Sequence, residues 1–144
     1  MSRYFLEAGF RLTGLDYSQP MLSIARKRFP KARWVLGDIA NLSFGEAFDG
    51  ILSWHGFFHL DAVAQRSTLP KISAHMVPGA PLMLTVGPQA GEVTGRVGGD
   101  TVHHASLSET EYRKRLDKAG LDVEAFVRSD PGCGGAKVLF GIKR

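Results

Sequence analysis

The sequence predicts an α/β fold with a three-layer, mostly parallel sheet, and three observations lead to this prediction. Apolar, strand-like runs alternate along the chain with segments of helical spacing. The run Pro81–Val86 is almost continuously apolar, as expected for a central strand of a parallel sheet. Two strand-like runs joined by a turn-rich loop end the chain, so we expect a mixed sheet whose C-terminal strand is antiparallel.

The first part of the chain predicts the end of a helix, then strands around a second helix. Gly9 stops the helical pattern of residues 1–8. Ser18 is a suitable N-cap for a helix whose apolar face ends at Phe29, and Pro30 terminates that helix. We expect strands at 10–16, 33–37 and 48–54.

The second part predicts two capped helices and further strands. Asp61 can cap a helix that runs to Met76 and is broken or kinked at Pro70. Ser108-Glu109-Thr110-Glu111 is a capping box, and its helix is expected to end near Ala119. Beside the strand Pro81–Val86 we expect a small hairpin of 93–97 and 101–105, turning at 98–100, and final strands at 121–127 and 136–142.

Length and composition limit what kind of protein this is. The 144 residues suffice for a core, and we expect one domain over residues 1–144. No apolar run approaches the roughly 20 residues that a membrane span needs, so no membrane partner is expected. The single cysteine, Cys133, fits a reducing compartment, and the N-terminus lacks a signal-peptide pattern, so we expect a cytoplasmic protein.

The net charge of +4 comes largely from basic residues in segment 26–33. Arg26, Lys27 and Arg28 fall in the last turn of a predicted helix, where cations complement the helix dipole. A nucleic-acid patch is the competing interpretation. No interleaving of aromatic and basic residues supports it, so nucleic acid is not expected as a partner.

Two acidic residues stand where strand-like runs end, Asp16 after the first strand and Asp38 after the second. An ionised carboxylate only accepts hydrogen bonds, so it suits the two hydroxyl donors of a ribose. Ligands of open α/β sheets bind outside the carboxyl ends of the strands. The two carboxylates therefore predict a nucleoside-shaped ligand lying across neighbouring strand ends.

Five short motifs follow one another along the chain. They are Gly14-Leu15-Asp16-Tyr17-Ser18 with Met21-Leu22, Gly37-Asp38-Ile39, Phe48-Asp49-Gly50-Ile51, Pro78-Gly79 and Ser108-x-x-Glu111-Tyr112. Each motif alone is weakly specific, but the ordered set covers essentially the whole chain. It resembles the class I S-adenosylmethionine-dependent methyltransferases, and among them the small methyltransferases of type 11. The resemblance implies a Rossmann-like methyltransferase sheet and S-adenosylmethionine as cofactor.

The resemblance also implies roles for individual residues. In this family the acid after the second strand binds the ribose hydroxyls, which corresponds to Asp16. The acid after the third strand reaches the adenine amino group, which corresponds to Asp38, and residues after the fourth strand face the methionine part. The cofactor-binding residues implied in this way are Asp16, Tyr17, Ser18, Met21, Asp38, Ile39, Ser53, Trp54 and His55.

One feature of the family has no counterpart in residues 1–144, namely a first strand that ends in a Gly-x-Gly-x-Gly loop. Residues 3–9 already resemble the end of the helix that follows that strand, so the resemblance implies an N-terminally truncated domain with its first strand missing. That strand lies mid-sheet in the family, and without it backbone groups of two strands lose their partners. We expect either that the neighbouring strands close up or that a second copy, in a homodimer, covers the gap.

His55 and His59 stand four residues apart and are the candidate catalytic residues. Either can act as a general base or orient an acceptor group at the mouth of the site. The spacing also resembles a metal pair, but the glutamate of a His-Glu-x-x-His motif is absent and no third ligand is evident, so no metal is expected. The remaining interpretation is that both pack as loop residues against the cofactor. His103 and His104, in a late loop, either cap the acceptor site or are surface residues.

The main hypothesis is therefore S-adenosylmethionine-dependent methyl transfer to a small-molecule acceptor, with the activity of this chain by itself left open. Enzymes that methylate base amines carry Asn/Asp-Pro-Pro-aromatic where this chain has Ser53-Trp54-His55-Gly56, which favours a small molecule. One alternative is a non-catalytic remnant that binds a nucleoside or dimerises. The other is an NAD-dependent oxidoreductase, because Asp16 also suits the ribose of NAD, although Gly-x-Gly-x-x-Gly is absent.

Overall fold

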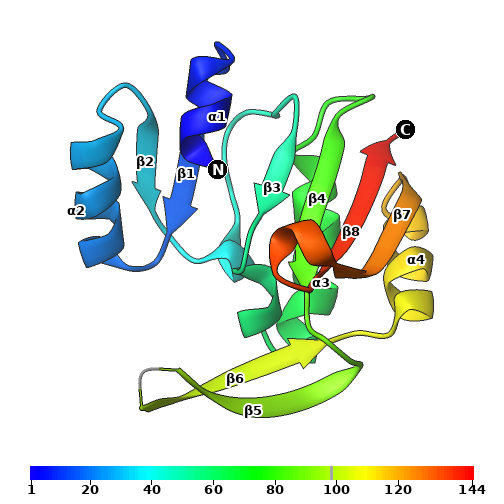
Figure 1. Cartoon of the computed structure of the whole chain (residues 1–144). Helices are drawn as coiled ribbons and strands as arrows, with labels where there is room; N and C mark the ends of the chain where they lie inside the picture. The colour runs from blue at the N-terminus through cyan, green and yellow to red at the C-terminus, as the bar shows by residue number, and fades with distance from the viewer. Residues whose placement is uncertain (98) are drawn as a thin grey trace. The chain divides into compact units, whose positions relative to one another are not determined.

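The computed structural model describes the backbone of residues 1–97 and 99–144, and the side chains of these residues except at positions 96, 97, 100 and 101. The chain divides into two compact units, Met1–Leu42 and Ser43–Arg144. Figure 1 shows the elements of both units, with the first unit in blue to cyan. The first unit contains α1 (Ser2–Glu7), β1 (Thr13–Asp16), α2 (Gln19–Arg28), β2 (Arg33–Leu36) and the 3-10 turn η1 (Ile39–Asn41).

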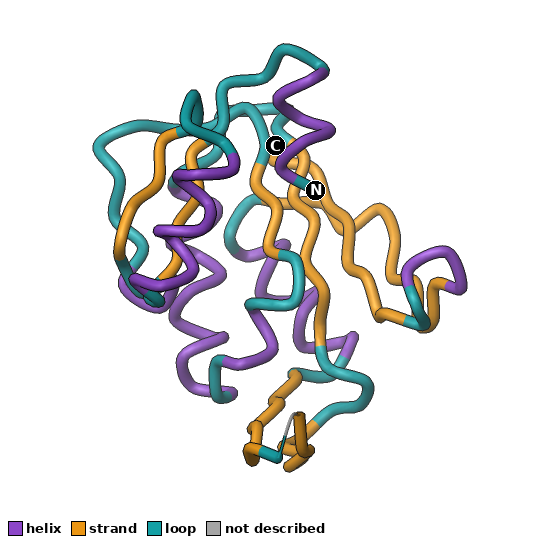
Figure 2. The backbone as a smooth tube through the Cα atoms, turned by 60° about the vertical axis from the view of Figure 1, so that its left-hand side comes forward, coloured by secondary structure: helices purple, strands orange, loops and turns teal. Residues whose placement is uncertain are grey.

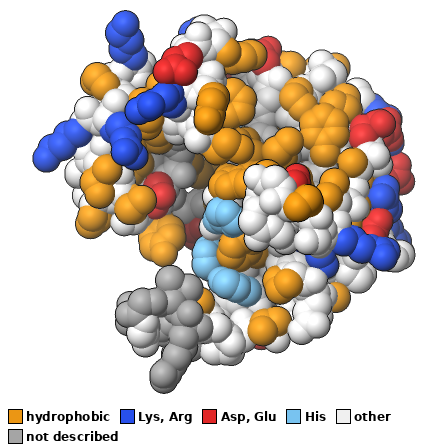
Figure 3. Space-filling model, in the orientation of Figure 1, with side chains coloured by type: hydrophobic (Ala, Val, Ile, Leu, Met, Phe, Trp, Pro, Cys, Tyr) orange, Lys and Arg blue, Asp and Glu red, His pale blue; other side chains and the backbone are white. Residues whose placement is uncertain are grey.

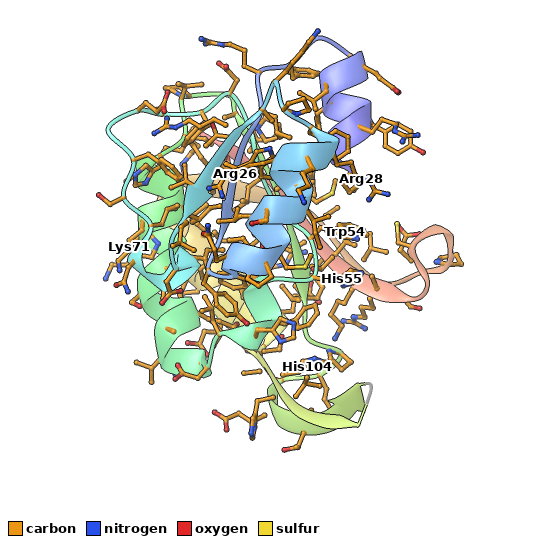
Figure 4. The ribbon with its side chains drawn as sticks, turned by 90° about the vertical axis from the view of Figure 1, so that its left-hand side faces the viewer. Arg26, Arg28, Trp54, His55, Lys71 and His104 are labelled. Atoms are coloured by element: carbon orange, nitrogen blue, oxygen red, sulfur yellow. The ribbon has the colours of Figure 1, made fainter. Side chains whose placement is uncertain are left out.

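The first unit is built around a parallel pair of strands. β1 pairs with β2 in parallel, and α2 connects them and packs against both. Ser18 caps α2 as expected, because its Oγ accepts a hydrogen bond of 3.4 Å from the backbone N–H of Met21. At the other end of α2, the Arg26 guanidinium donates to the carbonyl of Trp34 at 3.2 Å. The basic last turn of α2 is thus partly tied to the neighbouring strand, and Figure 4 labels Arg26 and Arg28 on this helix.

The register of β1 and β2 explains the glycine of the first motif. Gly14 lies opposite Trp34 in the strand pair. A Cβ atom at position 14 would lie 2.2 Å from Cζ3 of the indole, so no larger residue fits there. The indole Nε1–H donates to the carbonyl of Phe29 at 3.0 Å, which fixes the ring across β1. The packing of the indole on the backbone of Gly14 therefore holds the register of the pair, in which Asp16 and Leu36 end the two strands side by side.

The second unit is built on a mixed four-stranded sheet in the order β3-β4-β8-β7. β3 runs parallel to β4, whereas β8 is antiparallel to both β4 and β7. The strands are β3 (Ile51–Ser53), β4 (Pro81–Val86), β7 (Leu121–Asp130) and β8 (Ala136–Lys143), with the 3-10 turn η3 (Pro131–Cys133) between the last two.

Two helices lie side by side behind this sheet, as Figure 1 and the turned view of Figure 2 show. They are α3 (Ala62–Ala74) and α4 (Glu109–Lys118). Both caps are as expected, because Asp61 accepts from the N–H of Ala64 at 2.7 Å and Ser108 accepts from the N–H of Glu111 at 3.1 Å. α3 continues through the exposed Pro70, so of the predicted break or kink at this residue the break is wrong.

A hairpin of β5 (Gly91–Val97) and β6 (Asp100–Ser106) completes the second unit, together with the 3-10 turn η2 (Phe57–His59). The two strands are antiparallel, and each is slightly longer than predicted. The expected turn at 98–100 includes Gly98, which lies outside the described residues. Within the described part of the chain, no helix is long and apolar enough to cross a membrane.

The α/β class, the antiparallel C-terminal strand and most predicted elements are confirmed, but a single mostly parallel sheet is not what the structure has. The described residues form three sheets, and the largest holds one parallel and two antiparallel pairings. In the largest sheet β3, β4 and β7 run in the same direction and β8 runs opposite to them, as predicted, so the difference lies in β1–β2 and β5–β6, which form separate two-stranded ladders. β1 and β3 are also shorter than predicted, since the chain before Thr13 and Ile51 makes no ladder.

Candidate functional site

The two acidic residues lie at the same edge of the first unit. β1 ends at Asp16 and β2 ends at Leu36, and these two residues are register partners in the parallel pair. The N–H of Gly37 donates to the carbonyl of Asp16 at 3.0 Å, which holds the two strand ends together. Asp38 follows directly, so both carboxylates leave the carboxyl edge of neighbouring parallel strands, as the sequence predicts.

Each carboxylate also stabilises the turn that follows its strand. Oδ1 of Asp16 accepts from the N–H of Ser18 at 2.8 Å, and Oδ1 of Asp38 accepts from the N–H of Ala40 at 2.9 Å. The second oxygen of Asp16 has no hydrogen bond to any described residue, and it is therefore available to the hydroxyl donors of a ribose. Asp38 is exposed, and the N–H of Ile39 at the first position of η1 has no acceptor within that turn. The Ile39 N–H donor and the Asp38 carboxylate acceptor are neighbours in the chain, and their chemistry is complementary to the ring nitrogen and amino group of an adenine.

The other predicted cofactor residues of the first unit flank this corner. Tyr17 and Met21 are 81 % and 54 % exposed, so their apolar surfaces are available to cover a ligand. Ser18 uses its hydroxyl oxygen as the helix cap, so its structural role in α2 is established by the hydrogen bond to Met21. The corner therefore combines two carboxylates with exposed apolar side chains.

The predicted residues of the second unit lie at the end of β3, where Thr85 of β4 holds the chain. The hydroxyl of Thr85 accepts from the N–H of His55 at 2.7 Å and donates to the carbonyl of Ser53 at 3.4 Å. His55 has a φ of 54°, the one positive value among the described residues other than glycine. Non-glycine residues held in this left-handed region are uncommon and concentrate at functional sites.

A row of aromatic rings runs from the end of β3 into η2 and β6. The rings of Trp54 and His55 lie 5.3 Å apart between centroids, and Phe58 lies 5.8 Å from His55 and 4.7 Å from His59. Phe58 thus contacts both candidate catalytic histidines. Phe58 also lies 4.8 Å from His104 of β6.

His59 and His104 face each other, with ring centroids 5.1 Å apart, at a hollow of about 130 Å³. We call this feature the histidine hollow, and Figure 3 shows His side chains gathered beside hydrophobic ones on this face of the molecule. Figure 4 labels His104, which comes from the hairpin, and Trp54 and His55, which follow β3. The histidine hollow is lined by His59, Asp61, Glu92, His103, His104 and Ala105.

The environment of His104 differs from that of an exposed histidine. Burial of the ring lowers its pKa below the usual 6.5, and the neighbouring charge of His59 lowers the pKa further. His104 is therefore a neutral imidazole at pH 7, which can accept a proton. Among the described residues, no group of three or more His, Cys, Asp or Glu is placed to hold a metal ion.

A buried polar network underlies the histidine hollow, and little in the local sequence patterns indicates it. Gln65 and Tyr112 are completely buried, and the phenol O–H of Tyr112 donates to Oε1 of Gln65 at 2.5 Å. The Nε2–H groups of Gln65 donate to the carbonyls of Leu60 and Ala105 at 2.8 and 2.7 Å. The N–H of Leu107 donates to the phenol oxygen at 3.3 Å. The network thereby fixes the segments that carry His59 and His104 to each other.

One half of the residues at the histidine hollow was predicted from the sequence. His59 was predicted in the site, whereas His103 and His104 were left open between an acceptor cap and the surface. Asp61 was predicted only to cap a helix, and Glu92 had no predicted role. The signal that could have revealed the buried network is Tyr112 on the inner face of α4, because the hydroxyl of a buried tyrosine needs a hydrogen-bond partner.

The comparisons with known proteins decide the family. Residues 1–79, more than half of the chain, match the family described as a methyltransferase domain. The chain belongs to the S-adenosylmethionine-dependent methyltransferase family. A curated relative, the trans-aconitate 2-methyltransferase of Delftia acidovorans (strain DSM 14801 / SPH-1), is 36 % identical over 93 residues, which cover 62 % of this chain and 34 % of that protein. This methyltransferase domain therefore spans about a third of the length of that relative.

Solved structures show the same α/β methyltransferase fold at low sequence identity. An S-adenosylmethionine-dependent methyltransferase from Clostridium acetobutylicum ATCC 824 matches with a TM-score of 0.79 and 14 % identity over 99 % of this chain and 78 % of that one. A second match is an amino pentose methyltransferase of calicheamicin biosynthesis from Micromonospora echinaspora, which was solved with S-adenosylmethionine bound. Its TM-score is 0.77 and its identity 18 %, over 99 % of this chain and 78 % of that one.

Proposed function

We propose that this protein transfers a methyl group from S-adenosylmethionine to a small-molecule acceptor. The observation that carries the proposal is the pair of carboxylates, Asp16 and Asp38, at the ends of neighbouring parallel strands. Both lie within the segment that matches the methyltransferase family. Two such strand ends are where open α/β sheets bind nucleotide ligands.

The cofactor roles follow from the groups that the first unit leaves available. The second oxygen of Asp16 accepts from the ribose hydroxyls, while Asp38 accepts from the adenine amino group and the Ile39 N–H donates to the adenine ring. Tyr17 and Met21 cover the nucleoside with their exposed apolar surfaces. When bound, S-adenosylmethionine supplies a methyl group on a positively charged sulfur that is a good leaving group. The protein's part in such a displacement is to position the acceptor and keep water away.

The second unit is proposed to receive the acceptor. Ser53, Trp54 and His55 follow β3, and His55 and His59 both border the ring of Phe58. We propose that these histidines orient the acceptor group or take its proton. Two of the relatives support a small acceptor, since one is named for trans-aconitate and the other for an amino pentose.

Two alternative functions came from the sequence, an NAD-dependent oxidoreductase and a non-catalytic remnant, and membership of the methyltransferase family affects the first of them. An NAD-dependent oxidoreductase is not supported, because the chain belongs to a methyltransferase family. A non-catalytic remnant would bind S-adenosylhomocysteine without transferring methyl groups, which the experiment below distinguishes.

We also propose that residues 1–144 act as one methyltransferase domain that forms a homodimer. Among the described residues, β1 and β3 each pair along one side only. An unpaired strand edge favours pairing with another chain. Sedimentation at several protein concentrations should give a dimer mass, whereas a monomer at all concentrations would contradict the dimer.

The test of the cofactor proposal is calorimetric titration of the full-length protein with S-adenosylhomocysteine. Asp16→Asn retains the oxygen that accepts from Ser18 but replaces the other with a donor, so we expect the affinity to fall about tenfold or more. Asp49→Asn, at an exposed position before β3, is the matched control and should bind as the wild type does. Equal affinity of wild type and Asp16→Asn would contradict the assignment. Methyl transfer is then measured with radiolabelled S-adenosylmethionine.

A further inference from the structure

The charge of the histidine hollow indicates which acceptors it admits. Asp61 and Glu92 contribute carboxylates, which are negatively charged at neutral pH, and none of the described lining residues is Lys or Arg. Oδ1 of Asp61 accepts from the N–H of Ala64, whereas Oδ2 has no partner among the described side chains. Glu92 is exposed on β5 and has no ion pair with a described residue. Among the described side chains, neither Oδ2 of Asp61 nor the carboxylate of Glu92 has a positively charged partner.

The imidazoles of the histidine hollow add a proton acceptor to this negative site. The ring of His104 lies 4.8 Å from that of Phe58 and 5.1 Å from that of His59, and these three rings contact one another. The titratable groups that surround it are His59 of η2, Asp61 before α3, Glu92 of β5 and His103 of its own strand. The lowered pKa of His104 keeps its imidazole neutral at pH 7, so that a ring nitrogen has a lone pair to receive a proton.

We propose that the histidine hollow receives an acceptor that carries an amine in its ammonium form, and that His104 removes the proton before methyl transfer while His55 and His59 orient the acceptor. This inference rests on the proposed methyl transfer and names its acceptor class. Asp61 and Glu92 attract the ammonium group and would repel an acceptor carboxylate. A carboxylate acceptor would need a positively charged side chain, which the described lining does not supply.

The reaction balances with S-adenosylmethionine as the second substrate. A nitrogen of His104 takes one proton from the ammonium group, which frees the lone pair of the acceptor nitrogen. That lone pair forms the new nitrogen–carbon bond as the carbon–sulfur bond breaks, and the electron pair of the broken bond stays on sulfur as a neutral thioether. The product nitrogen is a methylammonium, and the proton on His104 is released to solvent.

The first experiment compares the binding of two probes of similar size and opposite charge, benzylammonium and benzoate, to the full-length protein. Binding is followed at pH 7 through the imidazole C–H signals in NMR spectra. We expect benzylammonium to shift the His59 and His104 signals and benzoate to leave them unchanged. In the double variant Asp61→Asn/Glu92→Gln, removal of both charges should weaken benzylammonium binding about tenfold. Asn is as good an N-cap as Asp, so the variant retains the cap of α3.

The matched control is Glu124→Gln, which removes a carboxylate from an exposed position on β7 that does not line the hollow. It should bind benzylammonium as the wild type does. Binding of benzoate, binding of neither probe, or equal benzylammonium affinity in the double variant would each overturn the amine assignment. Titration with S-adenosylhomocysteine is a separate measurement, so loss of the proposed function is distinguished from loss of this inference.

The second experiment tests the role of His104 by methylation of benzylamine at pH 7 and pH 9. Loss of a general base should slow the His104→Gln variant about 100-fold at pH 7. The deficit should shrink toward pH 9, where much of the amine is already deprotonated and needs no base. An equal deficit at both pH values would show a merely structural role. No methylation of benzylamine by the wild type would overturn the assignment of His104 as the base.

Discussion

The two units of this chain differ in how many apolar side chains they bury, although both carry candidate site residues. In the first unit, Met1–Leu42, the described residues include one buried apolar side chain, Leu22, while Tyr4 and Phe10 are 73 % and 60 % exposed. In the second unit, strands and helices bury many apolar residues, among them Leu116 and Leu139 with no exposed surface. Both units nevertheless carry candidate site residues.

The difference shows which contacts hold the candidate site residues of each unit in place. A segment of about 40 residues buries too little apolar surface to be stable alone without help from a ligand or another part of the protein. The position of Asp16 and Asp38 is fixed instead by contacts within the unit, such as the Trp34 indole on the backbone of Gly14 and the hydrogen bond from the Gly37 N–H to the Asp16 carbonyl. The histidine hollow depends on long-range contacts, because Gln65 and Tyr112 stand far apart in the sequence. We therefore expect the two sites to respond differently to mutations.

The largest expected effect is the loss of stability when a core leucine of one unit is replaced by alanine. Leu139→Ala removes a fully buried side chain of β8 and should lower the free energy of unfolding of the second unit by about 2–5 kcal/mol. Leu22→Ala should destabilise the first unit and leave the second nearly unchanged. Trp34 and Trp54 are the two tryptophans of the chain and lie in different units, so fluorescence during urea unfolding follows each unit separately.

Single-tryptophan variants, Trp54→Phe and Trp34→Phe, serve as the reference proteins for this measurement. If residues 1–144 form one domain, the fluorescence and the circular dichroism of each reference change at the same urea concentration. Leu22→Ala should then separate the transitions. Equal shifts of both transitions in Leu22→Ala would contradict the proposed difference between the units.

A smaller effect is expected from the buried network of the second unit. Tyr112→Phe leaves Oε1 of the buried Gln65 without its donor, which should cost about 1–3 kcal/mol. Tyr112→Phe/Gln65→Met removes both partners, but it also removes the bonds from Gln65 to two carbonyls, so the double variant should not be more stable than Tyr112→Phe. Urea unfolding followed at Trp54 measures both variants. A double variant as stable as the wild type would contradict a structural role for the network.

The smallest expected effect is the acid dependence of one ion-pair cluster. Hydrogen bonds from Arg66 and Arg115 hold the pKa of Glu111 at about 2, below the usual 4.5. Because this pKa is lower in the folded state, the stabilisation is fully present above about pH 4.5 and is lost as the pH falls toward 2. Both arginines are more than a third exposed, so solvent screening should limit the contribution to less than about 1 kcal/mol.

Glu111→Gln is the variant that tests this acid dependence. Urea unfolding between pH 6 and 3 should show that the variant loses less stability than the wild type does. Arg144 with Asp117 and Asp122 forms a separate cluster that both proteins retain, so it serves as an internal reference. Identical pH profiles of the two proteins would show that Glu111 contributes nothing.

Local patterns were enough to predict most elements and the acidic corner. Ser18, Asp61 and Ser108 were recognised as caps because capping depends on residues within three positions. The carboxylates of the first unit were predicted for a related reason, since parallel strands place their carboxyl ends at one edge. The number of sheets was not predictable in this way, because strand pairing depends on contacts between distant segments.

The sequence by itself determined the caps, the strand-end carboxylates and the family motifs, because each of these is a short-range pattern of side-chain chemistry. Only the tertiary structure decided that His59 and His104 face each other and that Asp61 and Glu92 line the same hollow. Those residues come from η2, the cap of α3 and both strands of a hairpin. They meet because the hairpin folds back and the buried bond between Gln65 and Tyr112 holds its base, which no local pattern encodes.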